Sequence, residues 1–117
     1  MSRREDHLVE RMAERYGRTH ASLVTVHRHE RLIRGAESLY VGMQDGPGRM
    51  ILLLKDCGVR WWIAWSDRLE HIETYLTEEQ ARVWERRASP LYMQPWSNAG
   101  RYTRAQPLQT ASCSRST

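Results

Sequence analysis

The sequence predicts one small α+β domain, and three of its features lead to that expectation. Its 117 residues, 40% of them hydrophobic, are enough to bury one independent core. A tryptophan-rich stretch at residues 50–66 has the pattern of a β-hairpin, and residues 2–17 and 77–88 each begin like a capped helix. We therefore expect an N-terminal helix, a mainly antiparallel sheet centred on the hairpin, a second helix and an extended C-terminal arm. Residues 1–97 would form the domain and residues 98–117 a polar, basic tail.

The N-terminal helix is expected over residues 2–17. Ser2 and Glu5 have the spacing of a capping box, in which each side chain satisfies a backbone donor of the first turn. The apolar side chains repeat at helical spacing on one face: Leu8, Val9, Met12, Ala13 and Tyr16. Gly17 then favours the end of the helix, because glycine accepts the left-handed backbone of a C-terminal cap.

Residues 18–44 allow two interpretations at their centre. The residues at 23–26 are mostly β-branched, which favours a strand. Leu23, Val26 and Glu30, with Leu32 and Ile33 beyond them, could also lie on a helix. We favour the strand and leave the helix open.

The hairpin is predicted from a turn signal between two apolar arms. Residues 51–54 form an apolar run that is too short for a buried helix, and Cys57 and Gly58 follow as residues suited to a tight reversal. Side chains alternate along the second arm, with Val59, Trp61, Ile63 and Trp65 on one face and Arg60, Trp62, Ala64 and Ser66 on the other. Both faces carry apolar groups, so the pair should lie centrally with structure packed on each side. We expect the tryptophans to be buried, except Trp62, which shares its face with polar neighbours.

Shorter strands are expected on both sides of the hairpin. Residues 39–41 form an apolar segment, and residues 44–48 after them carry a strong turn pattern of Asp, Gly and Pro. Residues 71–76 alternate and predict a third or edge strand. One side of that strand would carry Ile72, Thr74 and Leu76.

The helix predicted over residues 77–88 begins at a second capping box, formed by Thr77 and Gln80. Its inward side chains would be Ala81, Val83, Trp84 and Ala88. Pro90 and Pro95 forbid long regular structure beyond it. The arm that follows has four apolar side chains that could dock on the sheet: Leu91, Tyr92, Met93 and Trp96.

Positive charge is concentrated at the two ends of the chain. Residues 1–34 carry a net charge of +3 (eight Arg, five acids), residues 35–87 carry −2 (seven bases, nine acids) and residues 88–117 carry +3 (three Arg, no acid). This distribution favours nucleic acid or an acidic protein surface as the partner. Lys55 is the only lysine beside seventeen arginines, which is typical of a GC-rich bacterial or mobile-element genome.

The sequence predicts a cytoplasmic protein without membrane association. No apolar window approaches the roughly 20 residues that cross a bilayer, and the first residues lack the apolar core of a secretory signal. Cys57 and Cys113 make no disulfide framework, and we expect both to be free thiols.

One pattern within residues 9–31 resembles a helix-turn-helix motif. Ala13 and Gly17 stand four residues apart and are followed by the apolar anchors Leu23 and Val26. The resemblance implies a DNA-binding transcriptional regulator whose second helix lies in the major groove. The residues that would then contact nucleic acid are Arg18, Thr19, His20, His27, Arg28 and Arg31, with Ser22 and Thr25 on the same surface. The competing interpretation, one helix followed by a strand, is the one that we favour.

Little in the sequence points to catalysis. The chain has no glycine-rich phosphate loop, no nucleophile elbow and no HExxH motif, so we assign no catalytic residue, metal ligand or cofactor. His27 and His29 would share one face of a strand, but no third ligand stands at a zinc-like spacing. A small basic ribonuclease-like toxin is a third hypothesis, and it would draw on Arg28, Arg60, His71 and Tyr75.

The sequence therefore favours a non-enzymatic binding function. We expect a small accessory or inhibitory protein, of the kind that phages and plasmids encode, which binds a larger protein or nucleoprotein partner. Aromatic and arginine side chains dominate the binding energy of such interfaces. The expected partner-binding residues are Arg60, Trp62, Trp96 and Arg101. A homodimer through Trp62 or through an unpaired strand edge at residues 70–76 is also open.

Overall fold

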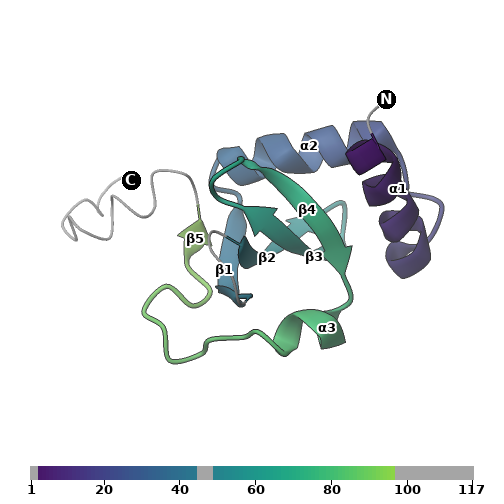
Figure 1. The fold of residues 1–117 in the computed structure, drawn as a ribbon. Coiled ribbons are helices and arrows are strands. Elements are labelled where there is room, and N and C mark those ends of the chain that lie inside the picture. The colour runs from purple at the N-terminus through teal and green to yellow at the C-terminus, as the bar shows by residue number, and fades with distance from the viewer. Residues whose placement is uncertain (1–2, 45–48, 97–117) are drawn as a thin grey trace.

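A computed structural model of the chain describes residues 3–44 and 49–96 and confirms the predicted α+β class (Figure 1). Within these residues, five strands form one antiparallel sheet in the order β4-β3-β2-β1-β5. In chain order the elements are α1 (Arg3–Tyr16), α2 (Leu23–Arg34), β1 (Ser38–Met43), β2 (Arg49–Asp56), β3 (Val59–Ser66), β4 (His71–Leu76), α3 (Glu78–Arg82) and β5 (Pro95–Trp96). The predicted N-terminal helix is α1, and the strands predicted at residues 39–41 and 71–76 are β1 and β4. The turn predicted at residues 44–48 lies mostly outside the described residues.

The sheet is covered on both faces, as expected for a central hairpin. In Figure 1, α1 and α2 lie on one side of the sheet and α3 lies on the other. The first side holds the larger buried cluster, made of Leu8, Met12, Val26, Ile33, Tyr40, Met50, Leu52, Leu54, Trp61, Ile63, Trp65, Ile72, Tyr75 and Trp96. The second side holds a smaller cluster, made of Val41, Ile51, Leu53, Trp62, Ala64, Leu76 and Ala81. The central strands thus send alternate residues into two cores, which fixes their register.

The hairpin folds back at the predicted turn. β2 and β3 pair antiparallel over their full lengths, up to Asp56 opposite Val59. Cys57 (φ 53°) and Gly58 (φ 76°) both have the left-handed backbone that a two-residue type I′ hairpin turn requires. The prediction of a reversal at these two residues is confirmed.

The preferred interpretation of residues 23–26 as a strand is wrong, because they begin α2. Ser22 caps the helix by accepting a hydrogen bond from the backbone N–H of Thr25 at 3.1 Å. Val26 and Ile33 lie on one face of the helix and are buried against the sheet. The preference of β-branched residues for strands is below about 1 kcal/mol per residue, so packing of this apolar face overrides it.

The helix that follows β4 is shorter than predicted. Its capping box is confirmed, with the side chains of Thr77 and Gln80 each accepting the backbone N–H of the other residue. α3 ends at Arg82 instead of continuing to Ala88, which is exposed. Val83, predicted to face inward, is 73% exposed.

α3 ends early because the segment that follows it runs alongside β1. Arg86 donates its backbone N–H to the Val41 carbonyl at 3.0 Å, and Glu85 pairs with Gly42 as an isolated bridge. A Cβ atom at Gly42 would lie 1.9 Å from the Trp84 carbonyl oxygen, so this close approach requires glycine. Extended backbone beside β1 is incompatible with a longer helix.

A bulge in β4 reverses one predicted arrangement of faces. Ala64 lies opposite Thr74, whereas the next residue, Trp65, lies opposite Ile72, so β4 has one extra residue at this point. Ile72 therefore packs in the first cluster and Leu76 in the second, although simple alternation predicts both on one side. One inserted residue inverts the side-chain alternation, and the pattern of residue types does not reveal it.

The C-terminal arm docks on the outer edge of β1. β5 pairs with β1, and the backbone of Tyr40 forms hydrogen bonds with Met93 and Gln94. Trp96 is 2% exposed, and its ring lies against the ring of Tyr40 at a centroid distance of 5.7 Å. The tail predicted at residues 98–117 lies outside the described residues.

Candidate partner-binding site

A small pocket opens on the second side of the sheet, beside α3 and the segment that follows it. Its volume is about 110 Å³. Its lining residues are Val41, Leu53, Lys55, Arg60, Trp62, Arg82, Glu85, Tyr92 and Met93. We call it the α3-side pocket. Because its residues come from β1, β2, β3, α3 and the C-terminal arm, the pocket exists only when these parts are assembled.

Two cations face each other across the hairpin at this pocket. Lys55 on β2 lies directly opposite Arg60 on β3. Side chains placed in this way have Cβ atoms about 4.5–5.5 Å apart, and like charges at that separation destabilise a sheet. Both residues are exposed, and within residues 3–44 and 49–96 neither side chain forms an ion pair or a hydrogen bond. The pair therefore leaves positive charge that an anionic group of a partner could neutralise.

The opposite wall of the pocket holds a carboxylate that is already paired. Arg82 donates to Glu85 at 2.9 Å and to Glu78 at 2.8 Å. Its guanidinium also lies 5.3 Å from the ring centroid of Trp62. The Tyr92 hydroxyl donates to Glu85, and this hydrogen bond is the main reason that the pKa of Glu85 lies below its usual range. Glu85 therefore pairs with Arg82 and Tyr92, and it forms no ion pair with Lys55 or Arg60.

The pocket brings together two of the four residues predicted to bind a partner. Arg60 and Trp62 line it, whereas Trp96 lies in the core on the first side of the sheet. The expectation that Trp62 is exposed is wrong, because α3 and the Arg82 guanidinium cover the indole and leave it 5% exposed. Trp96 is also buried, so its indole serves the core. Arg101 lies outside the described residues.

Most of the residues that line the pocket could not be predicted from the sequence. Lys55 carried a usable signal, since a turn at Cys57 and Gly58 dictates that Lys55 lies opposite Arg60. The residues from α3 and the arm carried none, because their positions depend on where α3 ends and on how the arm crosses the sheet. Met93 belongs to this second group.

A buried polar network occupies the first side of the sheet. His29 has no exposed surface; its Nδ1 shares a hydrogen bond of 2.9 Å with the Tyr75 hydroxyl, and its Nε2 lies 3.4 Å from an Asp56 carboxylate oxygen. Arg28 donates two hydrogen bonds, of 2.9 and 2.8 Å, to the same carboxylate. Burial lowers the pKa of His29 to about 4, so the imidazole is neutral at pH 7. This network ties α2 to the tip of the hairpin.

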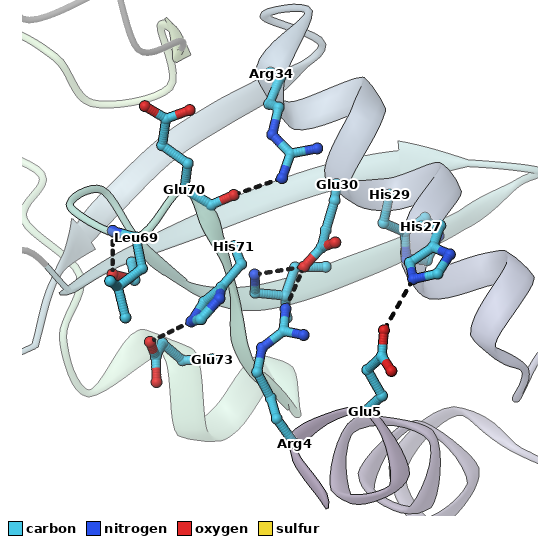
Figure 2. A network of polar contacts seen from close by, with 12 residues as sticks. Arg4, Glu5, His27, His29, Glu30, Arg34, Leu69, Glu70, His71 and Glu73 are labelled. Carbon is cyan, nitrogen blue, oxygen red and sulfur yellow. Dashed lines mark hydrogen bonds and ion pairs between the residues drawn. The ribbon is translucent and has the colours of Figure 1, made fainter. Parts of the chain in front are cut away.

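A second network, drawn in Figure 2, joins the helices to β4. Glu30 is buried and accepts the Ile72 backbone N–H at 3.0 Å as well as the Arg4 guanidinium. Arg15 donates to the backbone carbonyl of Tyr75. Helix side chains thus occupy backbone groups at two points along β4, one of the two edge strands of the sheet. This edge therefore offers little for the homodimer pairing that the sequence left open.

α2 is a helix, as a helix-turn-helix motif requires. The connection before α2 and the packing around it differ from that motif. The α1–α2 connection covers residues 17–22, which is longer than the usual turn of about 3–4 residues. α2 also packs on a sheet. His27 is exposed and pairs with Glu5 at 3.1 Å, and it does not share a face with the buried His29. Arg28 is held by its hydrogen bonds across to the hairpin.

The other residues predicted to contact nucleic acid differ in their exposure and surroundings. Arg31 and Thr19 are exposed, but His20 turns inward, with its ring 5.6 Å from that of Trp61. Arg18 lines a larger pocket of about 520 Å³ beside α1, whose other residues are Asp6, Val9, Glu10, Ala13, Glu14 and Ala21. Three carboxylates in that wall would repel a phosphate.

The residues of the ribonuclease-like hypothesis do not meet. Tyr75 is buried on the first side of the sheet, whereas Arg60 lies at the pocket on the second side. Arg28 is bound at the hairpin tip, and His71 contacts Glu73 on β4 at 3.0 Å. Side chains on different faces cannot converge on one scissile phosphate.

The fold and the pocket define a small α+β domain with a cationic, partly aromatic surface site. No protein-family model, no curated protein and no solved structure matches the chain. Among the described residues, no helix has the length and apolarity to cross a membrane, and no group of three or more His, Cys, Asp or Glu side chains could hold a metal ion. The function must therefore be argued from the site.

Proposed function

We propose that this chain is a small non-enzymatic accessory or inhibitory protein that binds a larger protein or nucleoprotein partner through the α3-side pocket. The observation that carries the proposal is the in-register pair of Lys55 and Arg60, neither of which forms an ion pair among the described residues. Two like charges that face each other reduce the stability of a sheet. A local arrangement that costs stability is expected where function requires it.

The side chains around the pocket support a protein interface. Trp, Tyr, Met and Arg are enriched at the centres of such interfaces. Three lining residues of these types are exposed or half-buried: Tyr92, Met93 and Arg60. Met93 is 38% exposed, so an apolar surface lies beside the cations. We place the protein in the cytoplasm, where the exposed thiol of Cys57 would stay reduced.

The proposal is tested by identifying the partner and then removing the two cations. The tagged chain captures its partner from an extract of the host, and mass spectrometry identifies it. Calorimetry then measures the affinity of the purified partner for the wild type and for a Lys55→Gln, Arg60→Gln double variant. We expect binding at least about tenfold weaker, because a hydrogen bond to a charged group contributes about 1.5–3 kcal/mol.

A matched control removes a charge from the other side of the sheet. Arg3 is exposed on α1, so Arg3→Gln should bind the partner like the wild type. Equal affinities of the wild type and the double variant would refute the assignment of the pocket.

Binding to duplex DNA through α2 is a second candidate, and the helical backbone of residues 23–34 is the observation that favours it. Such binding would weaken steeply with added salt, because it releases counterions from phosphates. It would also weaken in Arg28→Ala and Arg31→Ala. Duplex binding that persists unchanged in both variants, or that is absent at low salt, would exclude this candidate.

A further inference from the structure

We infer that the α3-side pocket receives one acidic side chain, Asp or Glu, from the partner protein, with an apolar neighbour of that side chain lying against Met93. The inference rests on the proposed function, because it specifies the chemistry of the partner at the same site. Three properties of the pocket lead to it: its size, its charge and its apolar lining.

The pocket is too small for a cofactor or a nucleotide. Sites for such ligands have volumes of roughly 300–1,000 Å³. The α3-side pocket has a volume of about 110 Å³, which suits one side chain. Hot-spot residues of protein interfaces commonly fill a pocket of this kind on the other protein.

The charge of the pocket selects a carboxylate. Lys55 and Arg60 extend from neighbouring strands, and neither has a carboxylate partner among the described residues. Glu85, on the other wall, is bound by Arg82 at 2.9 Å and by the Tyr92 hydroxyl, so it does not neutralise them. A carboxylate placed between the two cations would relieve their repulsion and accept charge-assisted hydrogen bonds, for which the guanidinium fork is suited.

The surroundings of the cations favour a protein over a nucleic acid. Met93, which is 38% exposed, adds apolar surface beside the buried lining residues Val41, Leu53 and Trp62, and this surface is matched by a partner that carries apolar groups beside its charge. Glu78, which binds Arg82 beside the pocket, would repel a run of phosphates. A single carboxylate flanked by apolar residues avoids that repulsion.

A pair of blocked peptides tests the inference. The isotope-labelled full-length protein is titrated with acetyl-Leu-Glu-Leu-amide and with acetyl-Leu-Gln-Leu-amide, which differ only in charge. We expect the Glu peptide to shift the indole N–H resonance of Trp62 in a saturable way, with an affinity at least about tenfold above that of the Gln peptide. The response should be lost in the Lys55→Gln, Arg60→Gln variant and retained in Arg3→Gln, because Arg3 is exposed on α1. Added salt should weaken it.

Three outcomes would overturn the inference. Equal shifts with the two peptides would show that the pocket does not select a carboxylate. Shifts confined to α1 and α2 would place the peptide elsewhere. A short DNA or RNA strand that binds at Trp62 more tightly than the Glu peptide would make phosphate the occupant.

The two proposals fail in different ways. Suppose that the double variant of Lys55 and Arg60 no longer binds the purified partner, and that the wild type does not bind the Glu peptide. The pocket is then the partner site, and the inference that it receives an acidic side chain is wrong. If the peptides discriminate but the double variant binds the partner normally, the proposed function fails and the chemistry of the pocket stands.

Discussion

The hydroxyl group of Tyr16 accepts a hydrogen bond from the backbone N–H of Trp62 at 2.8 Å, so a side chain of α1 reaches into the sheet. The same hydroxyl donates to the carbonyl of Leu76, which is the residue opposite Trp62 in β4. Tyr16 thus bridges the last residue pair of β3 and β4. Burial raises the pKa of Tyr16 to about 12, so the hydroxyl keeps its proton and can donate at neutral pH.

We expect Tyr16→Phe to lower the free energy of unfolding by about 1–3 kcal/mol, because it leaves a backbone donor and a backbone acceptor without their partner. Urea unfolding followed by tryptophan fluorescence measures the change. Thr19→Ala is the control, since Thr19 is exposed and its loss should change stability by less than about 0.5 kcal/mol. Equal stability of Tyr16→Phe and the wild type would contradict the bridging role.

The protein should lose stability as the pH falls from 6.5 to about 4, because of His29. Burial lowers the pKa of His29 from 6.5 to about 4 in the folded protein, so the unfolded chain takes up the proton first. The contribution of the neutral imidazole is complete above the unfolded pKa and declines by up to about 3 kcal/mol as the folded pKa is reached. Urea midpoints measured across this interval report the loss.

His29→Gln separates this effect from other acid-sensitive groups. The variant should be less stable at neutral pH and should show a flatter stability profile in the same interval. Asp56 acts at lower pH, because the hydrogen bond from Arg28 lowers the pKa of Asp56 below 3.8. Its contribution is present above that value and is lost only as the pH falls below it. A profile in His29→Gln as steep as in the wild type would assign the acid sensitivity to another group.

Lys55→Glu should raise stability while it removes partner binding. The introduced carboxylate would face Arg60 as an opposite charge, and cross-strand pairs of opposite charge contribute about 0.2–1 kcal/mol. Thermal unfolding and the peptide titration, carried out on the same variant, measure the two effects. Lys55→Gln should lie between the wild type and Lys55→Glu in stability. A less stable Lys55→Glu would show that the facing cations do not strain the hairpin.

Gly42→Ala should destabilise the protein by about 1–3 kcal/mol, because overpacking forces the backbone to shift. The added Cβ would lie 1.9 Å from the Trp84 carbonyl oxygen, so β1 and the segment after α3 would have to separate. That segment lines the α3-side pocket, and the Glu peptide should therefore bind more weakly as well.

Gly35→Ala is the matched control for this substitution. Gly35 has a φ of −87°, and a Cβ there would lie 3.5 Å from its nearest neighbours, which is an ordinary contact. We expect a stability change below about 1 kcal/mol in urea unfolding. If both glycine variants lost the same stability, the close approach at Gly42 would not be the cause.

The parts of the fold that could be predicted from the sequence are those with local signals. Cys57 and Gly58 define the turn, and once the turn is placed, alternation assigns each side chain of residues 50–66 to a face. The capping box at Thr77 and Gln80 is equally local. The position of Lys55 opposite Arg60, on which the pocket depends, follows from the same turn.

The parts that could not be predicted depend on contacts between distant segments. α2 forms because Val26 and Ile33 pack on a sheet that comes later in the chain, and this packing outweighs the local strand preference. Trp62 is buried because Arg82 folds over it from a helix whose end is set by the approach to Gly42. Neither the helix at α2 nor the burial of Trp62 can be predicted from the residues adjacent in the sequence.

Glu30 and Arg15 protect the edge strand β4 through their hydrogen bonds to the backbones of Ile72 and Tyr75. A neighbouring molecule that tried to extend the sheet would have to expel a buried carboxylate and strand the guanidinium of Arg4 without its counter-ion. Open-ended fibril growth along β4 is thereby disfavoured. A second copy of the chain would have to break these bonds before one of its strands could pair with β4.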